Sequence, residues 1–290
     1  MGAGVSSIMG LIGDAGRRKT GLGDLPEDCV ALVLTHLDPV EICRVARLSR
    51  TFRGAASANL VWETKVPRNY RYLLALASEE YNGSLLWKEI YARLCRPIPL
   101  NGGTQEFWLE KTSGQICMSI SSKALMIAGV NDHRYWKHIP TNESRFGIVP
   151  YLEQTWWFEV IGEIDFCFPA GTYSLFFRFH LGRPYRRLGR RICTSKHIHG
   201  WEIKPIKFQL STSYGQLTRS KCYLDKPGRW ILYHAGDFVV DDSDELMNLK
   251  FSAKQVDCTH TKGGLCVDSV LICPKEFRPG RVCICDKIAE

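Results

Sequence analysis

Two hydrophobic patterns divide the chain near residue 100. From about residue 24 to 95 the apolar residues recur at helical spacing, as Val30, Val33 and Leu37 do. From about residue 105 onward, apolar and polar residues alternate in short runs that Gly, Pro and Asp separate. Such alternation is typical of strands that bury one face. The pattern therefore predicts a helical region followed by an all-β domain.

Helix start signals support the first half of this division. Asp38 is an N-cap candidate, because Pro39 follows it at the first helical position and a glutamate stands three residues past the cap. Ser49 and Asn59 are further N-cap candidates. Residues 1–23 are rich in Gly and Ser without periodicity, and we expect a mobile tail there.

The second half is predicted to form a β-sandwich. Alternate residues of 172–181 separate into two sets. One set is apolar and consists of Leu175, Phe177, Phe179 and Leu181. The other is mixed and consists of Ser174, Phe176, Arg178 and His180. Similar runs occur near 206–211 and 247–251. Several such runs with turn signals between them predict an antiparallel, jelly-roll-like sandwich. No helix alternates with the strands, as a parallel α/β fold requires.

Residues 25–62 carry a recognisable motif. Leu-Pro opens it, Leu-Asp-Pro ends its first helix, Ile-Cys-Arg-Val-Ala-Arg-Leu-Ser follows, and Leu-x-Trp closes it. In this order and spacing the segment resembles the F-box. The resemblance implies binding to a Skp-type adaptor, and through it to the cullin of a ubiquitin ligase. The residues it assigns to adaptor contact or to the F-box core are Leu25, Pro26, Leu32, Leu37, Ile42, Val45 and Trp62.

Simple physics supports a partner for this segment. Three short helices totalling about 40 residues bury too little surface to be stable alone. An apolar helical face that stays unburied fits a groove on another chain. The alternative is that these side chains only pack against the helices that follow, for example against Tyr72, Leu73, Leu86 and Ile90.

The rest of the chain, from about 115 to 275, carries many short motifs in order. They include Asn131–Trp136, Trp157–Val160, Gly171–Leu175, Gly200–Ile203 and Gly263–Val270. Together they resemble the phloem protein 2 domain of plants, of the A-type, Nictaba-like lectin group. Plant chains that join this domain to an F-box are a recognised type. The resemblance implies that the sandwich binds a glycan or a glycoprotein.

A sugar site needs an aromatic ring for the C–H face of the sugar and polar groups for its hydroxyls. Trp136, with Asp132 and Arg134 beside it, offers that combination. The alternative is that Trp136 is a buried sandwich aromatic. Glycan-binding members of the family have a second tryptophan seven positions earlier, where this chain has Gly129.

Other aromatic and basic residues have simpler interpretations. Trp156 and Trp157 would point to opposite faces of a strand, so at most one should lie outside the core. Arg178–Arg191 holds six arginines and no acid, within a net charge of +8. We favour a solvated loop there over a surface for acidic protein or nucleic acid, and expect no nucleic-acid partner.

Catalytic, metal and cofactor sites are not expected. The chain lacks G-x-S-x-G, H-E-x-x-H, P-loop and Rossmann glycine motifs. Its 12 cysteines are irregularly spaced without C-x-x-C, so neither a zinc ribbon nor a redox pair is indicated. A carbohydrate-active enzyme therefore ranks behind two alternatives: a ligase adaptor, or a stress or defence lectin that acts without the ligase.

No transmembrane run or secretory signal is found, and we expect a nuclear and cytoplasmic protein. The first six residues fit the N-myristoylation pattern at Gly2, although a chance match in a tail is the alternative. Membrane contact is expected only if Gly2 is myristoylated. The predicted boundaries are 1–23 tail, 24–66 F-box, 67–104 helical linker, 105–276 sandwich and 277–290 C-terminal tail.

Overall fold

The computed structural model describes most of the chain after the first 24 residues. The predicted tail, with Gly2, lies outside the described residues. The described ranges are 25–77, 85–187, 190–195, 197–242, 245–277, 279–280, 282–283 and 286–287.

The first part is helical, as predicted. Its helices are α1 (Glu27–Leu34), α2 (Pro39–Val45), α3 (Arg50–Ala55), α4 (Asn59–Glu63), α5 (Tyr70–Leu76) and α6 (Trp87–Leu94). The cap predictions for α2 and α3 are confirmed, because Asp38 accepts from the Glu41 N–H at 2.8 Å and Ser49 from the Phe52 N–H at 3.2 Å. The prediction for α4 is wrong, since Asn59 is its first residue and Ala58 occupies the cap. Within the described ranges, no helix is long and apolar enough to cross a bilayer.

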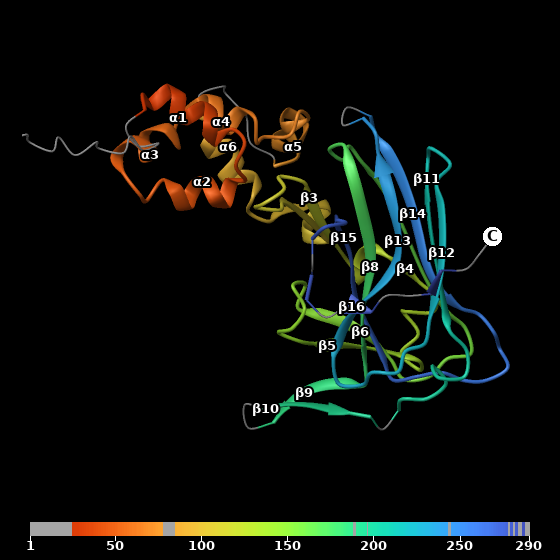
Figure 1. Ribbon diagram of the computed structural model, residues 1–290. Helices are drawn as coiled ribbons and strands as arrows, with labels where there is room; N and C mark the ends of the chain where they lie inside the picture. Colours follow the sequence, from red (N-terminus) through yellow and green to blue (C-terminus); the bar gives the residue numbers. More distant parts are fainter. Residues whose placement is uncertain are drawn as a thin grey trace, which may run out of the picture.

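Two β-sheets pack face to face in the second part (Figure 1). Sheet A has the order β1 (Ile98–Leu100), β2 (Gln105–Leu109), β3 (Ile116–Ser121), β15 (Leu265–Pro274), β8 (Gly171–Leu181), β13 (Trp230–Val240) and β16 (Val282–Cys283), with β6 (Ile148–Leu152) beside β15 and β5 (Trp136–Pro140) beside β6. Sheet B has the order β17 (Asp286–Lys287), β12 (Leu217–Cys222), β11 (Ile206–Thr212), β14 (Met247–Gln255), β7 (Phe158–Phe166) and β4 (Met126–Ile127). Only the β13–β16 pairing is parallel among the described strands. The predicted antiparallel β-sandwich is confirmed.

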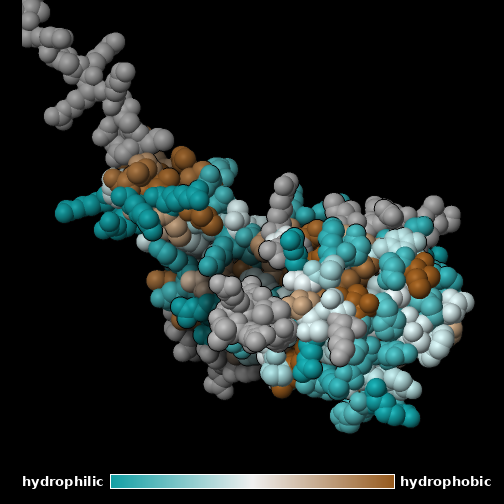
Figure 2. Space-filling view, turned by 90° about the horizontal axis from the view of Figure 1, so that it is seen from below, coloured by the Kyte–Doolittle hydropathy of each residue, from teal (hydrophilic) through white to brown (hydrophobic). Residues whose placement is uncertain are grey.

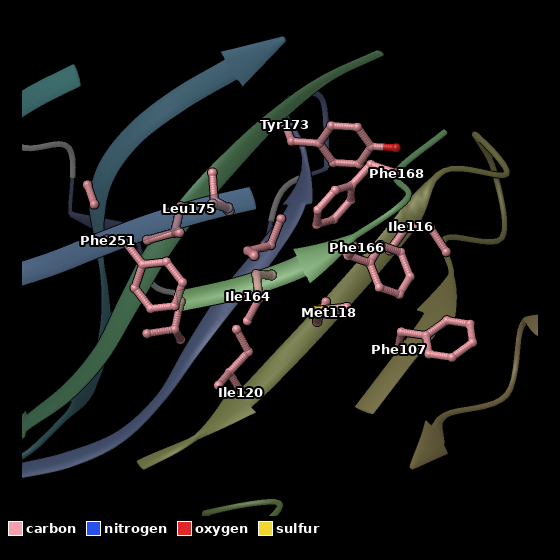
Figure 3. Packing of buried hydrophobic residues seen from close by; sticks show 14 of the residues in the cluster. Phe107, Ile116, Met118, Ile120, Ile164, Phe166, Phe168, Tyr173, Leu175 and Phe251 are labelled. Carbon is pink, nitrogen blue, oxygen red and sulfur yellow. The ribbon is translucent and has the colours of Figure 1, made fainter. Parts of the chain in front are cut away.

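Alternation along the strands places the core between the sheets. Leu175, Phe177 and Phe179 of β8 point inward and are buried, as the pattern predicted. Figure 3 shows the packing at one end of this core, where Phe107 of β2 and Phe166 of β7 approach with ring centroids 5.7 Å apart. Aromatic contacts of this kind hold the two sheets together.

Helices and sandwich share one continuous core. Leu73, Ile90 and Leu94 belong to the same buried cluster as Phe107 and Phe166. The Tyr91 hydroxyl donates a 3.1 Å hydrogen bond to the carbonyl of Lys111 in the sandwich. The helical region is therefore docked against the sandwich through α5 and α6.

Some predicted boundaries are corrected. Strand β1 belongs to sheet A, although 67–104 was expected to be a helical linker. Strands β16 and β17 fall in the expected C-terminal tail and extend both sheets. The arginine-rich stretch, expected to be a loop, forms the hairpin β9 (Arg183–Arg187) and β10 (Arg190–Thr194), at the end of the sandwich far from the helices (Figure 1).

Candidate functional site

Helix α1 presents two different faces. Val30, Ala31 and Leu34 are buried against the other helices. Leu32 and Val33 point away from them, and the side chain of Leu32 is 56% exposed. Exposed branched apolar side chains on a small helical unit mark an interaction surface.

Further apolar side chains of the helical region are also exposed. We name the whole group the exposed apolar set: Leu25, Pro26, Leu32, Val33, Leu48 and Leu60. Figure 2 shows apolar atoms gathered on the helical end of the molecule. Arg44, Arg47 and Arg53 of the helical region are exposed as well. Exposed apolar residues accompanied by polar ones are common in protein interfaces.

The residues predicted for adaptor contact or F-box core fall into three groups. Leu25, Pro26 and Leu32 are exposed and remain available to a partner. Ile42 and Trp62 are buried, and the Trp62 indole N–H donates to the Ala56 carbonyl at 2.7 Å. Leu37 and Val45 are partly buried against the same core. Internal packing therefore accounts for Ile42 and Trp62 but not for the exposed set.

Trp136 was predicted to stack on a sugar, and the structure corrects this prediction. Its side chain is 2% exposed at the start of β5, and its indole N–H donates to the Ala128 carbonyl at 3.2 Å. The turn from Ala128 to Tyr135 folds back on the ring. The backbone carbonyl of Asp132 accepts a hydrogen bond from the backbone N–H of Trp136, which holds the turn in this position. The ring therefore has no free face for a ligand.

Asp132 and Arg134, the other two predicted sugar ligands, lie on the surface and bind each other. The Arg134 guanidinium donates to Asp132, with 2.7 Å between Nη2 and Oδ2. Hydrogen bonds from the Arg134 side chain and backbone lower the pKa of Asp132 to about 2. Because Trp136 is buried, the three residues of the predicted sugar site do not form one binding surface.

Trp156 and Trp157 are both on the surface, so the expectation that at most one lies outside the core is wrong. Their side chains are 52% and 46% exposed. Strand β7 begins only at Phe158, and the two tryptophans lie in the loop before it. Alternation of strand faces therefore does not apply to them. Sequence reasoning missed this pair as an exposed aromatic surface.

Hydrogen bonds hold the tandem tryptophans in place. The Thr155 hydroxyl accepts from the Trp157 N–H at 3.2 Å and donates to its carbonyl at 3.0 Å. The Trp157 indole N–H donates to the Glu159 carboxylate at 3.0 Å. Lys262 Nζ donates to the Trp156 carbonyl at 2.8 Å. The Trp157 ring is thus exposed yet held by its indole hydrogen bond, which lowers the entropy cost of binding a ligand on it.

Lys262 is unusual because it is 0% exposed and has no carboxylate partner among the described residues. Its ammonium also donates to the carbonyls of Gln255 at 3.1 Å and Asp257 at 3.0 Å. Burial lowers its pKa. This one side chain ties the tryptophan loop to the end of β14.

A helical region with the exposed apolar set, followed by a β-sandwich, fits the class of F-box proteins that carry a second, all-β domain. The model described as F-box-like matches residues 22–68, and the model described as Phloem protein 2 matches residues 115–274. F-box protein PP2-A13 of Arabidopsis thaliana is 57% identical over 91% of this chain and 91% of its own length. F-box protein PP2-A12 of Arabidopsis thaliana is 52% identical over 92% of each chain. The chain belongs to the phloem protein 2 family, among the members that carry an F-box.

Similarity to solved structures is distant. A family 35 carbohydrate binding module from Clostridium thermocellum is 10% identical, covering 55% of this chain and 98% of that chain with a TM-score of 0.33. A likeness at this level carries no argument about ligands.

Proposed function

We propose that this protein is the substrate-recognition subunit of a Skp–cullin–F-box ubiquitin ligase. Its F-box region binds a Skp-type adaptor, and through the adaptor the cullin. The sandwich binds a glycan or glycoprotein target, and other subunits carry out ubiquitin transfer. The observation that supports this proposal is the exposed apolar set, which lies on a helical region whose core is formed by other apolar residues, among them Val30, Ile42 and Trp62.

Burial of this set would supply much of the binding energy. Complete burial of one leucine side chain contributes about 1.5–3 kcal/mol. Leu25, Leu32, Leu48 and Leu60 can each contribute, because each is exposed in the free protein. A helical groove on the adaptor is the surface that such a set fits.

The proposed partners also determine where in the cell this protein would act. A subunit that docks on a Skp-type adaptor works where that adaptor is found, and we propose the nucleus and cytoplasm. Because Gly2 lies outside the described residues, contact with a membrane stays a prediction that depends on its myristoylation.

Co-purification tests the proposal. Tagged full-length protein should capture Skp-type adaptor and cullin from plant extract, and the double variant Leu25→Ala, Pro26→Ala should lose most of both. Leu246→Ala, on the exposed surface of the sandwich, is the matched control and should capture both normally. Equal capture by the double variant and the wild type would count against adaptor docking.

The alternative is a carbohydrate-binding stress or defence lectin that acts without the ligase. The exposed Trp156 and Trp157, with the Trp157 ring held by Glu159, favour a ligand-binding role that does not require the F-box. Under this alternative the wild type retains a glycan or glycoprotein on affinity purification, free glycan releases it, and no adaptor accompanies it.

A further inference from the structure

The outer face of sheet B carries a hollow of 710 Å³. This volume lies within the range of about 300–1,000 Å³ that small ligands occupy. Strands β11, β12 and β14 form its floor. Its basic lining residues are Lys204, Lys207, Arg219, Lys221 and Lys254.

Strand register aligns these residues in a row. Lys254 lies opposite Glu159 on one side and opposite Lys207 on the other. Lys207 lies opposite Lys221 in the next strand. Since neighbouring strands are about 5 Å apart, the row from Glu159 to Lys221 spans roughly 15 Å across the sheet. Arg219 is two residues from Lys221 on the same face.

The positive charge in this hollow is only partly compensated. Lys254 pairs with Glu159 at 2.8 Å, and Lys204 pairs with Asp257. Lys207 and Arg219 form no ion pair with any residue whose side chain the structure describes. Like charges directly opposite each other in a sheet are destabilising, so a bound anion would relieve a cost that the free protein carries.

An aromatic platform ends the row. Glu159 is the first residue of the row. Its carboxylate accepts one hydrogen bond from the Trp157 indole and one from the ammonium of Lys254, with which it also forms an ion pair. These two hydrogen bonds lower the pKa of Glu159 and keep it ionised. The carboxylate therefore fixes the exposed Trp157 ring next to the first lysine of the hollow.

We propose that the outer face of sheet B binds a short oligosaccharide that carries carboxylate groups, with one sugar ring stacked on Trp157 and its carboxylates on Lys207 and Arg219. An indole suits the C–H face of a sugar, and ammonium and guanidinium groups suit carboxylates. Gln209 and Ser252 also line the hollow and offer an amide and a hydroxyl to sugar hydroxyl groups. The proposal rests on the target-recognition part of the proposed function, and does not require adaptor docking.

Calorimetric titration of the full-length protein with trigalacturonate tests the proposal. Fully methyl-esterified trigalacturonate, which has the same sugars but no charge, is the control ligand. The acid form should bind at least about tenfold more tightly, and its affinity should fall as salt rises. Lys207→Gln with Arg219→Gln should weaken binding at least about tenfold, as should Trp157→Ala. These side chains are on the surface, so the variants should fold normally.

Control variants and competitors complete the design. Lys123→Gln and Tyr214→Ala remove an exposed cation and an exposed ring elsewhere, and should bind trigalacturonate as the wild type does. Equal affinity for the esterified trisaccharide would overturn the proposal, as would unchanged binding by the Lys207 and Arg219 variant. A single-stranded RNA or an acidic peptide that binds more tightly at the same residues would overturn it in favour of that ligand. Absence of trigalacturonate binding in a protein that still captures the adaptor would reject this site and leave the ligase role intact.

Discussion

Asn69 donates a 2.7 Å hydrogen bond from its side-chain amide to the backbone carbonyl of Cys167. The first residue precedes α5 in the helical region and the second follows β7 in the sandwich. Beside this bond, the rings of Tyr72 and Phe166 meet edge to face with centroids 5.6 Å apart. The two parts of the chain are therefore joined by a polar and an aromatic contact, which fixes the direction in which the sandwich faces relative to the F-box.

Asn69→Ala should weaken this junction. The side chain is buried, and its loss leaves the Cys167 carbonyl without this donor, which costs about 1–3 kcal/mol in unfolding free energy. Chemical denaturation measures the change. Asn131→Ala, at an exposed loop position, should be nearly neutral. A neutral Asn69→Ala would mean that the junction does not depend on this hydrogen bond.

Replacing tryptophan by alanine should cost very different amounts of stability at positions 136 and 157. Trp136→Ala removes a buried ring and should lower the unfolding free energy by about 3–5 kcal/mol. Trp157→Ala removes an exposed ring and should cost less than about 1 kcal/mol. Urea unfolding of both variants measures the difference. If Trp157→Ala is the more damaging change, the assignment of Trp136 to the core and Trp157 to the surface is wrong.

Lys262→Met should be among the more destabilising single changes. Methionine has a similar length but leaves three backbone carbonyls without their donor, and each unpaired buried group costs about 1–3 kcal/mol. Lys250→Met, at an exposed lysine of β14, is the matched control. Thermal unfolding compares the two. Equal melting temperatures would show that Lys262 does not hold the tryptophan loop.

Asp237 should make stability depend on acid pH. Burial opposes its ionisation, but hydrogen bonds from His234, Ser174 and Lys275 outweigh burial and hold its pKa well below the usual value. The folded protein therefore gains stability above the ordinary aspartate pKa of about 3.9, and loses it as pH falls below that value.

Asp237→Asn removes this contribution. The variant should be about 2 kcal/mol less stable at neutral pH, and the gap to the wild type should narrow below about pH 4. Denaturation curves at several pH values measure this. A gap that stays constant from neutral to acid pH would contradict the role given to the carboxylate.

Local sequence patterns were sufficient to predict the helices and strands, but not to predict which residues form the candidate binding surfaces. Alternation in 172–181 gave the correct inward set for β8, because successive side chains of a strand point to opposite faces, but it did not show that the outer face of β8 is also largely buried. The side chains of Asp38 and Ser49 cap helices as predicted, because an N-cap depends on three neighbouring residues.

The candidate sites depend on residues far apart in the chain. The turn that covers Trp136 is held partly by the bond from the Ala128 N–H to the Glu159 carbonyl, and no pattern around position 136 shows this. The row of Glu159, Lys254, Lys207 and Lys221 exists only because four strands pair in one register. Trp156 and Trp157 stay outside because β7 starts one residue after them, and strand ends are the least predictable part of a pattern.

The most direct test of the account is the affinity of the full-length protein for a purified Skp-type adaptor, measured for Leu32→Asp and Leu246→Asp. The two leucines are 56% and 57% exposed, so neither change should alter the melting temperature by much. We expect Leu32→Asp to weaken adaptor binding by about 100-fold, because it loses the burial of a leucine and adds a charge to an apolar contact. Leu246→Asp should bind as the wild type does. Adaptor affinity that is the same for Leu32→Asp as for the wild type would contradict the proposed docking surface.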